Sequence, residues 1–217
     1  MKAWGAQALR LYLVTDSALS RGRSLLEVVE AAVQGGVSCV QLREKHLPTR
    51  DFVAQALALQ PLLQRHRVPL VINDRIDVAL ACEADGVHLG QSDMPVEAAR
   101  RLLPAQVFIG WSVETPDDVA RAHTLPVDYL GVSPVFATPT KTDTLRPWGL
   151  EGLQQVRQRT ALPLVAIGGI HAGNAQQVLQ AGADGLAVVS AICAADSPQA
   201  AAAELAQIGP PTGAATP

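Results

Sequence analysis

The sequence predicts a single α/β domain that folds as a closed (β/α)8 barrel of the TIM type. Eight short apolar runs alternate with helical patterns along nearly the whole chain of 217 residues, which is long enough to bury a sizeable core. Polar residues follow nearly every apolar run, as expected for the loops that line one end of such a barrel. A doubly wound open sheet is the main alternative, but it would gather those residues at one switch point.

The predicted strands are short apolar runs bounded by turn-forming or charged residues. In chain order they cover Leu11–Thr15, Val37–Arg43, Leu70–Asn73, Gly86–Leu89, Val107–Gly110, Tyr129–Val132, Leu164–Ile167 and Gly185–Val188.

The predicted helices fill the segments between these strands and one segment after the last strand. They cover Ser24–Gln34, Thr49–Arg67, Arg75–Glu83, Pro95–Leu103, Thr115–His123, Leu150–Arg159, Asn174–Ala181 and Pro198–Gln207. Ser24 with Glu27 three residues later forms a capping-box pattern, and Pro95 and Pro116 suit a first helical turn. Pro61 lies inside the second helix and should kink or split it.

The turns that lead from helices into strands share a weak repeat. Gly35–Val37, Ala84–Val87, Val127–Leu130 and Gly182–Leu186 each end a helix and open a strand. Glycine can terminate the helix, and the aspartate in the last three segments can bond local backbone groups in the turn. The repeat supports a succession of similar strand–helix units.

The barrel pattern occupies residues 10–208. Residues 1–9 precede it as an N-terminal tail or extra segment. Residues 209–217 are rich in glycine, proline and alanine, and we expect them to be disordered.

Composition and charge restrict the classes of partner. The formal net charge of −3 gives no general attraction to nucleic acid or to an anionic membrane. No apolar stretch approaches the roughly 20 residues that span a bilayer, and the N-terminus shows no signal-peptide pattern. Cys39, Cys82 and Cys193 lie in apolar surroundings without metal-like spacing, which favours buried free thiols in a reducing cytoplasm. We therefore expect a cytoplasmic protein that acts on small molecules, without nucleic-acid or membrane partners; the sequence leaves a homo-oligomer open.

The segment Gln41-Leu42-Arg43-Glu44-Lys45 is the strongest chemical signal. It ends the second predicted strand, where alternation places Gln41, Arg43 and Lys45 on one face. An amide and two cations on one face suit a phosphate or pyrophosphate better than a core. Any one of the three alone would be explained as a solvated strand end. Glu44 falls on the opposite face, where it can orient a neighbouring cation.

Two carboxylates follow neighbouring predicted strands and could share a metal ion. Asp74 comes directly after Asn73, and Asp93 follows the fourth strand. Mg²⁺ prefers oxygen ligands and often keeps waters and substrate phosphates in its shell. Helix capping is the competing interpretation, because Asp74 immediately precedes a helix and Asp93 lies two residues before Pro95. The combination of the two carboxylates with the phosphate-binding cations Arg43 and Lys45 favours the metal site. His88 is predicted to be a packed or hydrogen-bonded histidine rather than a ligand.

Later loops add candidate anion-binding groups. Ser112 follows the fifth strand, where its hydroxyl could donate to a phosphate or cap the next helix. The long loop 133–141 combines two threonines, a proline and Lys141, and long connections tend to be functional. Gly168–Gly169 and Val189–Ser190 end the last two strands, where many barrels bind a phosphate. For the glycine pair, an ordinary tight turn is the competing interpretation.

Taken together, these motifs resemble those of the thiamine-phosphate synthase family. Gln-Leu-Arg-Glu-Lys, Asn-Asp, His-Leu-Gly-Gln-x-Asp, Gly-x-Ser, Thr-Pro-Thr-Lys and Ile-Gly-Gly-Ile occur in the family's order over residues 10–195. The resemblance implies a barrel enzyme of thiamine biosynthesis, a transferase. It would join 4-amino-5-hydroxymethyl-2-methylpyrimidine diphosphate to a thiazole phosphate, or to its carboxylated precursor, and release pyrophosphate.

The resemblance also implies roles for individual residues. The pyrimidine diphosphate would be bound by Gln41, Leu42, Arg43, Glu44, Lys45, Asn73, Ser112 and Lys141. The thiazole phosphate would be bound by Thr138, Pro139, Thr140, Gly169 with Gly168 as a rival, Val189 and Ser190. Asp74 and Asp93 would bind Mg²⁺, the one cofactor expected. Arg43, Lys45, Lys141 and Ser112 would be the catalytic residues, because they can stabilise charge on a departing pyrophosphate.

Two residues depart from the family pattern, and three alternatives stay open. Ser133 stands where glycine is usual and Trp111 is bulky, so both could reshape the pocket. The alternatives are a thiazole tautomerase, a regulatory protein on the same barrel, and another phosphate-handling barrel enzyme such as an isomerase. Pro134 stands in the loop where the tautomerase has a histidine, and Lys141 is present, which disfavours the first. The intact charged residues disfavour the second, and the lack of a convincing acid/base pair disfavours the third.

Overall fold

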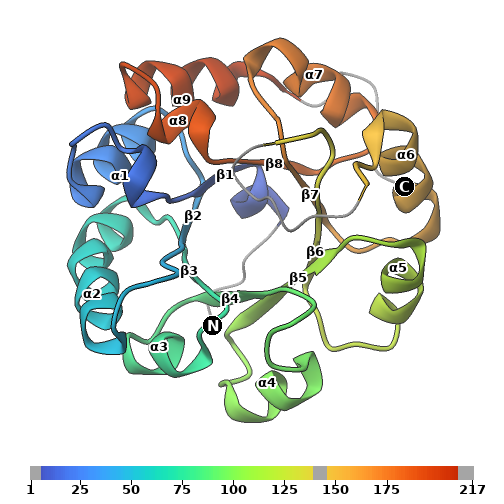
Figure 1. The fold of residues 1–217 in the computed structure, drawn as a ribbon, viewed down its shortest axis with the longest axis horizontal. Coiled ribbons are helices and arrows are strands. Elements are labelled where there is room, and N and C mark those ends of the chain that lie inside the picture. Colours follow the sequence, from blue (N-terminus) through green and yellow to red (C-terminus); the bar gives the residue numbers. More distant parts are fainter. Residues whose placement is uncertain (1–5, 139–145, 210–217) are drawn as a thin grey trace.

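A computed structural model describes residues 6–138 and 146–209 of the chain. Within these ranges eight parallel strands pair in the order β1 to β8 and close into a barrel, which the helices surround (Figure 1). The predicted (β/α)8 barrel is therefore confirmed. No helix in these ranges combines the length and apolar character needed to cross a membrane.

The elements follow one another with short connections. The strands are β1 (Leu11–Val14), β2 (Cys39–Leu42), β3 (Leu70–Asn73), β4 (Gly86–Leu89), β5 (Phe108–Val113), β6 (Tyr129–Val132), β7 (Leu164–Ile167) and β8 (Gly185–Val188). The α-helices are α1 (Leu25–Gln34), α2 (Thr49–His66), α3 (Ile76–Ala81), α4 (Val96–Leu102), α5 (Pro116–Ala122), α6 (Gly149–Arg159), α7 (Ala172–Gln180), α8 (Ser190–Cys193) and α9 (Pro198–Gln207). Two 3-10 helices, η1 (Ala6–Leu9) and η2 (Ser17–Leu19), flank β1.

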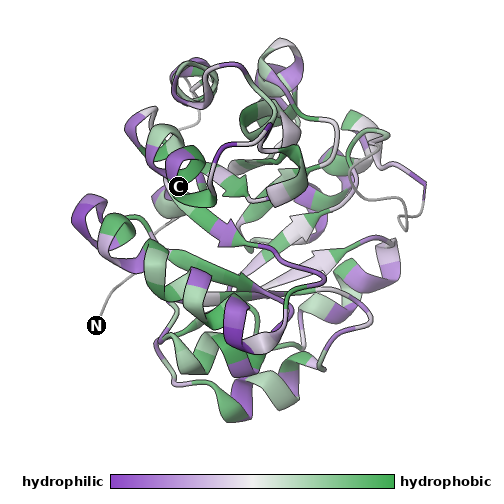
Figure 2. Ribbon diagram, turned by 60° about the vertical axis from the view of Figure 1, so that its left-hand side comes forward, coloured by the Kyte–Doolittle hydropathy of each residue, from purple (hydrophilic) through white to green (hydrophobic). Residues whose placement is uncertain are grey.

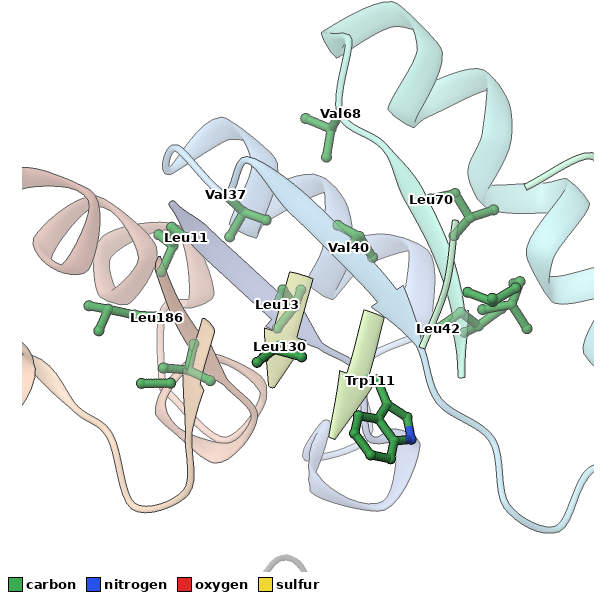
Figure 3. Packing of buried hydrophobic residues seen from close by; sticks show 14 of the residues in the cluster. Leu11, Leu13, Val37, Val40, Leu42, Val68, Leu70, Trp111, Leu130 and Leu186 are labelled. Atoms are coloured by element: carbon green, nitrogen blue, oxygen red, sulfur yellow. The ribbon is translucent and has the colours of Figure 1, made fainter. Parts of the chain in front are cut away.

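The strands separate two apolar layers, as expected for a parallel sheet that is buried on both faces. Outward side chains such as Leu13, Val40 and Leu130 pack against the helices (Figure 3). A separate interior cluster, which includes Tyr12 and Tyr129, fills the barrel. Green, apolar residues accordingly dominate the strands, and purple residues lie on the outer faces of the helices (Figure 2). Each fully buried aliphatic side chain contributes about 1.5–3 kcal/mol to folding.

Four side-chain oxygens hold the amino end of the barrel together. Each precedes an even-numbered strand and accepts a backbone N–H near the start of the strand before it. The pairs are Ser38 Oγ with Leu11 N at 2.9 Å, Asp85 Oδ2 with Leu70 N at 2.9 Å, Asp128 Oδ2 with Ile109 N at 2.7 Å and Asp184 Oδ2 with Leu164 N at 2.8 Å. In every pair the acceptor residue returns its own backbone N–H to its partner's carbonyl oxygen. We call these the amino-end pairs. They join the turn aspartates to a neighbouring strand, whereas the sequence predicted bonds within the turn.

The segment before β1 closes the same end of the barrel. η1 lies inside the ring of strands in the view down the barrel (Figure 1). Leu9 is buried in the interior cluster, and a Cβ atom on Gly185 would lie 1.9 Å from the Leu9 carbonyl oxygen. The last residue of the predicted tail or extra segment, Leu9, is therefore packed into the barrel. Residues 1–5 and 210–217 lie outside the described residues.

Two elements differ from their predicted form. β5 continues past Gly110 to Val113, because it pairs with both β4 and β6 beyond that point. Ser112 therefore lies inside a strand and not after it. α2 is a single helix that contains Pro61, so the helix is not split. Pro61 is exposed, and water can bond the carbonyl group that its missing N–H leaves unpaired.

The amino-end pairs predict a stability effect far from the carboxyl ends of the strands. Asp128→Ala should lower the free energy of unfolding by about 1–2 kcal/mol, because the buried N–H of Ile109 loses its side-chain acceptor. The melting temperature should then fall by roughly 2–8 °C. Asp128→Asn keeps an acceptor oxygen and should lose much less. Asp196→Ala, at a side chain that is 92% exposed, is the control. Thermal unfolding measured by circular dichroism compares the variants; equal losses for Ala and Asn would contradict the role of the acceptor.

Candidate active site

A cavity of about 570 Å³ lies at the carboxyl end of the barrel, and all eight strands or their following loops line it. Its size is typical of small-molecule sites. Of the residues predicted to form a site, those that line it are Gln41, Arg43, Lys45, Asn73, Asp74, Asp93, Ser112, Thr138, Gly168, Gly169, Val189 and Ser190. Pro139, Thr140 and Lys141 lie outside the described residues. Most of the predicted site residues thus meet at one cavity, although they make up less than half of its wall.

The loop after β1 positions Arg43. The backbone N–H of Arg43 donates to Oγ1 of the buried Thr15 at 3.0 Å. Its Nη1 lies 3.8 Å from Oδ2 of Asp16, whose other oxygen caps η2. At 3.8 Å the two charges attract without a direct hydrogen bond. The guanidinium therefore keeps its donors for a ligand while a carboxylate holds it at the cavity.

Lys45 is paired with one of the candidate metal ligands. Its Nζ lies 2.5 Å from Asp74 Oδ2. Because the Lys45 side chain is 45% exposed, the pair contributes little to stability, about 1 kcal/mol at most. What matters is its place: the ammonium neutralises a carboxylate at the edge of the cavity.

The other two residues of the Gln41–Lys45 segment face elsewhere. Leu42 is fully buried in the outer layer (Figure 3). Glu44 accepts a hydrogen bond from Ser17 Oγ at 2.5 Å. Neither residue lines the cavity, so any contact with a ligand there would have to use the backbone.

Asp74 lies close enough to Asp93 to affect the ionisation of the Asp93 carboxyl. Burial, followed by the hydrogen bond and charge of Asp74, raises the pKa of the Asp93 carboxyl; the N–H of Gly90, 2.7 Å away, opposes this shift. Asp74 has a positive φ of 62° in a tight turn, where Arg75 N donates to the Asn73 carbonyl at 2.7 Å. Two carboxylates that repel each other favour a bound cation between them.

Neither carboxylate caps a helix, so the competing interpretation of both residues is wrong. The N-cap residues of α3 and α4 are Arg75 and Pro95, and neither helix has a side-chain cap bond. Among residues 6–138 and 146–209, no group of three or more His, Cys, Asp or Glu side chains is placed to hold a metal. Two carboxylates beside an open cavity instead fit Mg²⁺, because waters and substrate phosphates can complete its coordination shell.

Asn73 presents a donor that lacks a partner. The residue is buried at the cavity wall, and its Nδ2 has no hydrogen-bond acceptor in the part of the chain that the structure describes. A buried donor without a partner costs about 1–3 kcal/mol. A ligand oxygen, such as one of a phosphate, would satisfy it.

A hydrogen-bond chain that was not predicted from the sequence crosses the barrel among the side chains that line the cavity. Gln41 Nε2 donates to Tyr12 Oη at 2.9 Å, and Tyr12 Oη lies 2.9 Å from Tyr129 Oη. His88 Nδ1 lies 2.9 Å from Tyr129 Oη, and His88 Nε2 lies 2.9 Å from Ser112 Oγ. The prediction that His88 is hydrogen-bonded is confirmed. The available signal was that both tyrosines of the chain occupy inward positions of strands.

The opposite wall depends on the glycine pair after β7. Gly168 and Gly169 have φ values of 105° and 65°. Cβ atoms there would lie 2.7 Å from Pro134 Cβ and 2.8 Å from Phe136 Cβ. The glycines therefore let the loop after β7 pack against the loop after β6. Both also line the cavity with Val189–Ser190, so the tight turn and the exposure to a ligand occur together.

Of the two departures from the expected pattern, only one reaches the cavity. Trp111 packs in the outer layer (Figure 3). The Arg121 guanidinium lies 5.4 Å from its ring centroid. Trp111 faces outward because Gly110 and Ser112 take the inward positions of β5, so it does not line the cavity. Ser133 is buried and does line it.

The chain is similar to enzymes of one family along almost its whole length. The thiamine monophosphate synthase family profile matches residues 11–192. Thiamine-phosphate synthase from Albidiferax ferrireducens is 75% identical over 202 residues, which cover 93% of this chain and 92% of that protein. The Chloroflexus aurantiacus thiamine-phosphate synthase is 54% identical over 90% of both chains.

Solved structures of similar proteins have the same fold. Thiamine phosphate pyrophosphorylase from Pyrococcus furiosus superimposes with a TM-score of 0.87 at 39% identity, covering 94% of this chain and 96% of the other. A 3-hexulose-6-phosphate synthase, at 18% identity and a TM-score of 0.63, covers 90% of this chain and 97% of its own; it shares the fold alone.

The closeness of Asp74 and Asp93 predicts that Asp93→Asn stabilises the metal-free protein and weakens its stabilisation by Mg²⁺. Because the folded state raises the pKa of Asp93, the ionised carboxyl destabilises the fold above that pKa. Asp93→Asn keeps the acceptor for Gly90 N and should raise the melting temperature at pH 7–8 by roughly 1–3 °C in metal-free buffer. The gain should shrink as the pH falls and Asp93 of the parent protein becomes protonated.

Added Mg²⁺ tests whether Asp74 and Asp93 bind a metal ion. Millimolar Mg²⁺ with pyrophosphate should stabilise the parent protein, because a ligand that binds only the folded state raises its melting temperature. The Asp93→Asn variant should gain little. Equal stabilisation of both proteins in differential scanning fluorimetry would argue against a metal site at Asp93.

Proposed function

The chain belongs to the thiamine monophosphate synthase family, and from that premise we propose that it catalyses the formation of thiamine phosphate. The reaction is an alkyl transfer. The hydroxymethylpyrimidine diphosphate supplies the pyrimidinylmethyl group, a thiazole phosphate accepts it, and pyrophosphate leaves. The observation that carries the proposal is the meeting of two cations, two carboxylates and an unpaired amide donor, Asn73, at one cavity.

The diphosphate end of the pyrimidine substrate is assigned to the wall beside β2 and β3. Arg43 and Lys45 supply charge-assisted hydrogen bonds, and Asn73 Nδ2 supplies the neutral donor. Ser112 adds a hydroxyl from β5, and Lys141 is assigned to the same group by resemblance. The two lysines are two of only three in the chain, the third being Lys2, so the chain has little other lysine charge to offer a phosphate.

Mg²⁺ is proposed as the cofactor, with Asp74 and Asp93 as its protein ligands. The oxygen-only donors, and the raised pKa of Asp93 that a cation would relieve, fit a hard divalent ion. When bound, such an ion supplies neutralisation of the diphosphate charge.

The proposed mechanism is a dissociative substitution. The bond between the pyrimidinylmethyl carbon and the diphosphate oxygen breaks, and its electron pair leaves with pyrophosphate. The resulting cation is stabilised by its amino-substituted ring, and the thiazole nitrogen then attacks the carbon. Arg43, Lys45 and Lys141 take up the charge of the leaving group, which is the electrostatic contribution that usually dominates. The barrel walls align the two substrates and exclude water that would trap the cation.

The thiazole phosphate is assigned to the opposite wall. Gly168–Gly169 and Val189–Ser190 line the cavity there, and their backbone N–H groups can approach a phosphate closely. The threonines of the loop after β6, Thr138 and Thr140, complete the set with Pro139. The loop after β6 then contributes to both substrates, because Lys141 of the same loop is assigned to the diphosphate.

We also propose that the protein works in the cytoplasm. Its three cysteines are all buried free thiols. Burial raises the pKa of both Cys82 and Cys193 to about 11, so they stay protonated and serve as packing groups. Free thiols that serve only in packing suit a reducing compartment.

Reconstitution tests the activity directly. Purified protein, both substrates and Mg²⁺ should yield thiamine phosphate, followed by oxidation to its fluorescent thiochrome product. Chelation of divalent ions should abolish the signal, and added Mg²⁺ should restore it. Absence of product with both substrates present would refute the activity, and product without divalent metal would refute the roles of Asp74 and Asp93.

Lys141→Ala tests the leaving-group assignment. Turnover should fall by about 100-fold or more, the usual effect of removing one donor to a developing anion. The melting temperature should stay nearly constant. Lys2→Ala is the matched control, since it removes the same charge from the N-terminal segment, and it should keep full turnover. An unchanged rate for Lys141→Ala would remove that residue from the mechanism.

A further inference from the structure

We infer that the hydrogen-bond chain in the cavity lining fixes the orientation of the Gln41 carboxamide. The chain thereby selects a pyrimidine that carries an amino group over one that carries an oxo group at the same ring position. Tyr12, Tyr129 and His88 are then positioning residues, because they act through Gln41 and Ser112 at the cavity wall. This inference rests on the proposed function, since it takes the pyrimidine diphosphate as the ligand of this cavity.

We assign the direction of the chain from its first donor. Gln41 Nε2 donates to Tyr12 Oη, and we assign the single Tyr12 proton to the bond with Tyr129 Oη, 2.9 Å away, where either hydroxyl can donate. In this assignment Tyr129 donates to His88 Nδ1, which lies 2.9 Å away. Each donor in the chain then determines the next one.

The last bond of the chain, between His88 and Ser112, determines which group Ser112 presents to the cavity. A neutral histidine that accepts at Nδ1 carries its proton on Nε2, and His88 Nε2 lies 2.9 Å from Ser112 Oγ. Ser112 then accepts from His88 and keeps its own hydroxyl proton for a ligand. One end of the chain therefore offers an acceptor, at Gln41, and the other end offers a donor, at Ser112.

Both tyrosines act in the chain as neutral phenols. Burial raises the pKa of both well above the ordinary value, so each keeps one proton for a hydrogen bond.

Close packing prevents the rings from leaving the chain. A Cβ atom on Gly110 would lie 2.0 Å from Tyr129 Cζ, so the phenol ring lies directly over that glycine. A Cβ atom on Gly131 would lie 2.8 Å from His88 Cε1. The two glycines make room for the rings, and Tyr129 also packs within the interior cluster.

The consequence appears at the Gln41 side chain. Because Tyr12 engages Nε2, the carboxamide oxygen Oε1 is left for the cavity; among the described residues no donor bonds to it. It can accept an N–H from an exocyclic amino group. An oxo group in the same place would set two acceptors against each other, and each would stay buried without a donor.

Binding, and not turnover, tests this selection, because the amino group also stabilises the cation. Calorimetric titration with Mg²⁺, without thiazole, compares the 4-amino pyrimidine diphosphate with its 4-oxo analogue. The parent protein should bind the amino compound at least about tenfold more tightly. Equal binding, or a preference for the oxo compound, would overturn the inference.

Two conservative variants test the positioning residues. Tyr12→Phe frees the carboxamide to turn, and Tyr129→Phe interrupts the relay, so in each the amino/oxo ratio should fall below about threefold. Val165→Ala is the control: it lines the same cavity without polar atoms and should leave the ratio unchanged, even where both compounds bind less tightly. A folded Tyr12→Phe variant that keeps the parental ratio would refute the role of the chain.

A second measurement needs no variant. The ¹⁵N chemical shifts of His88 should show an unprotonated Nδ1 and a protonated Nε2; the opposite tautomer would refute the direction of the chain. The thiochrome assay separates the two levels of the argument. Failure to form thiamine phosphate refutes the proposed function, whereas normal turnover with an unselective binding ratio refutes only this inference.

Discussion

Closure of the parallel sheet is the constraint on which the rest of the structure depends. Every strand is hydrogen-bonded on both sides, so all eight carboxyl ends meet at one rim. A chain that places a polar residue after each apolar run therefore collects those residues in one place. Gln41, Asn73, His88 and Ser112 come from four different strands, yet all line one cavity.

Electrostatic balance organises that rim before any substrate arrives. Lys45 lies on Asp74, and Arg43 lies near Asp16, so both cations already have a carboxylate beside them. Asp93 is the carboxyl whose ionisation is opposed. An incoming diphosphate and a divalent ion would each find opposite charges in place, which reduces the rearrangement that binding requires.

Periodicity predicted the barrel, and strand-end chemistry predicted many of the charged and polar residues of the cavity wall, because both depend on local sequence patterns. The same patterns failed where tertiary contacts decide. β5 continues through Ser112 because its neighbours offer pairing partners, and Pro61 is tolerated because its side of α2 faces water. The Tyr12–Tyr129 bond joins residues 117 positions apart on strands that do not pair, so no spacing rule could reveal it.

The amino-end pairs have a consequence for how such a protein can change. Each links only two adjacent strands, and it does so at the end of the barrel away from the cavity. Loops at the carboxyl end of the barrel can therefore be exchanged, lengthened or redesigned without disturbing the amino-end pairs. Substitutions at the amino end are therefore expected to affect stability, whereas changes in the loops at the carboxyl end can alter substrate preference.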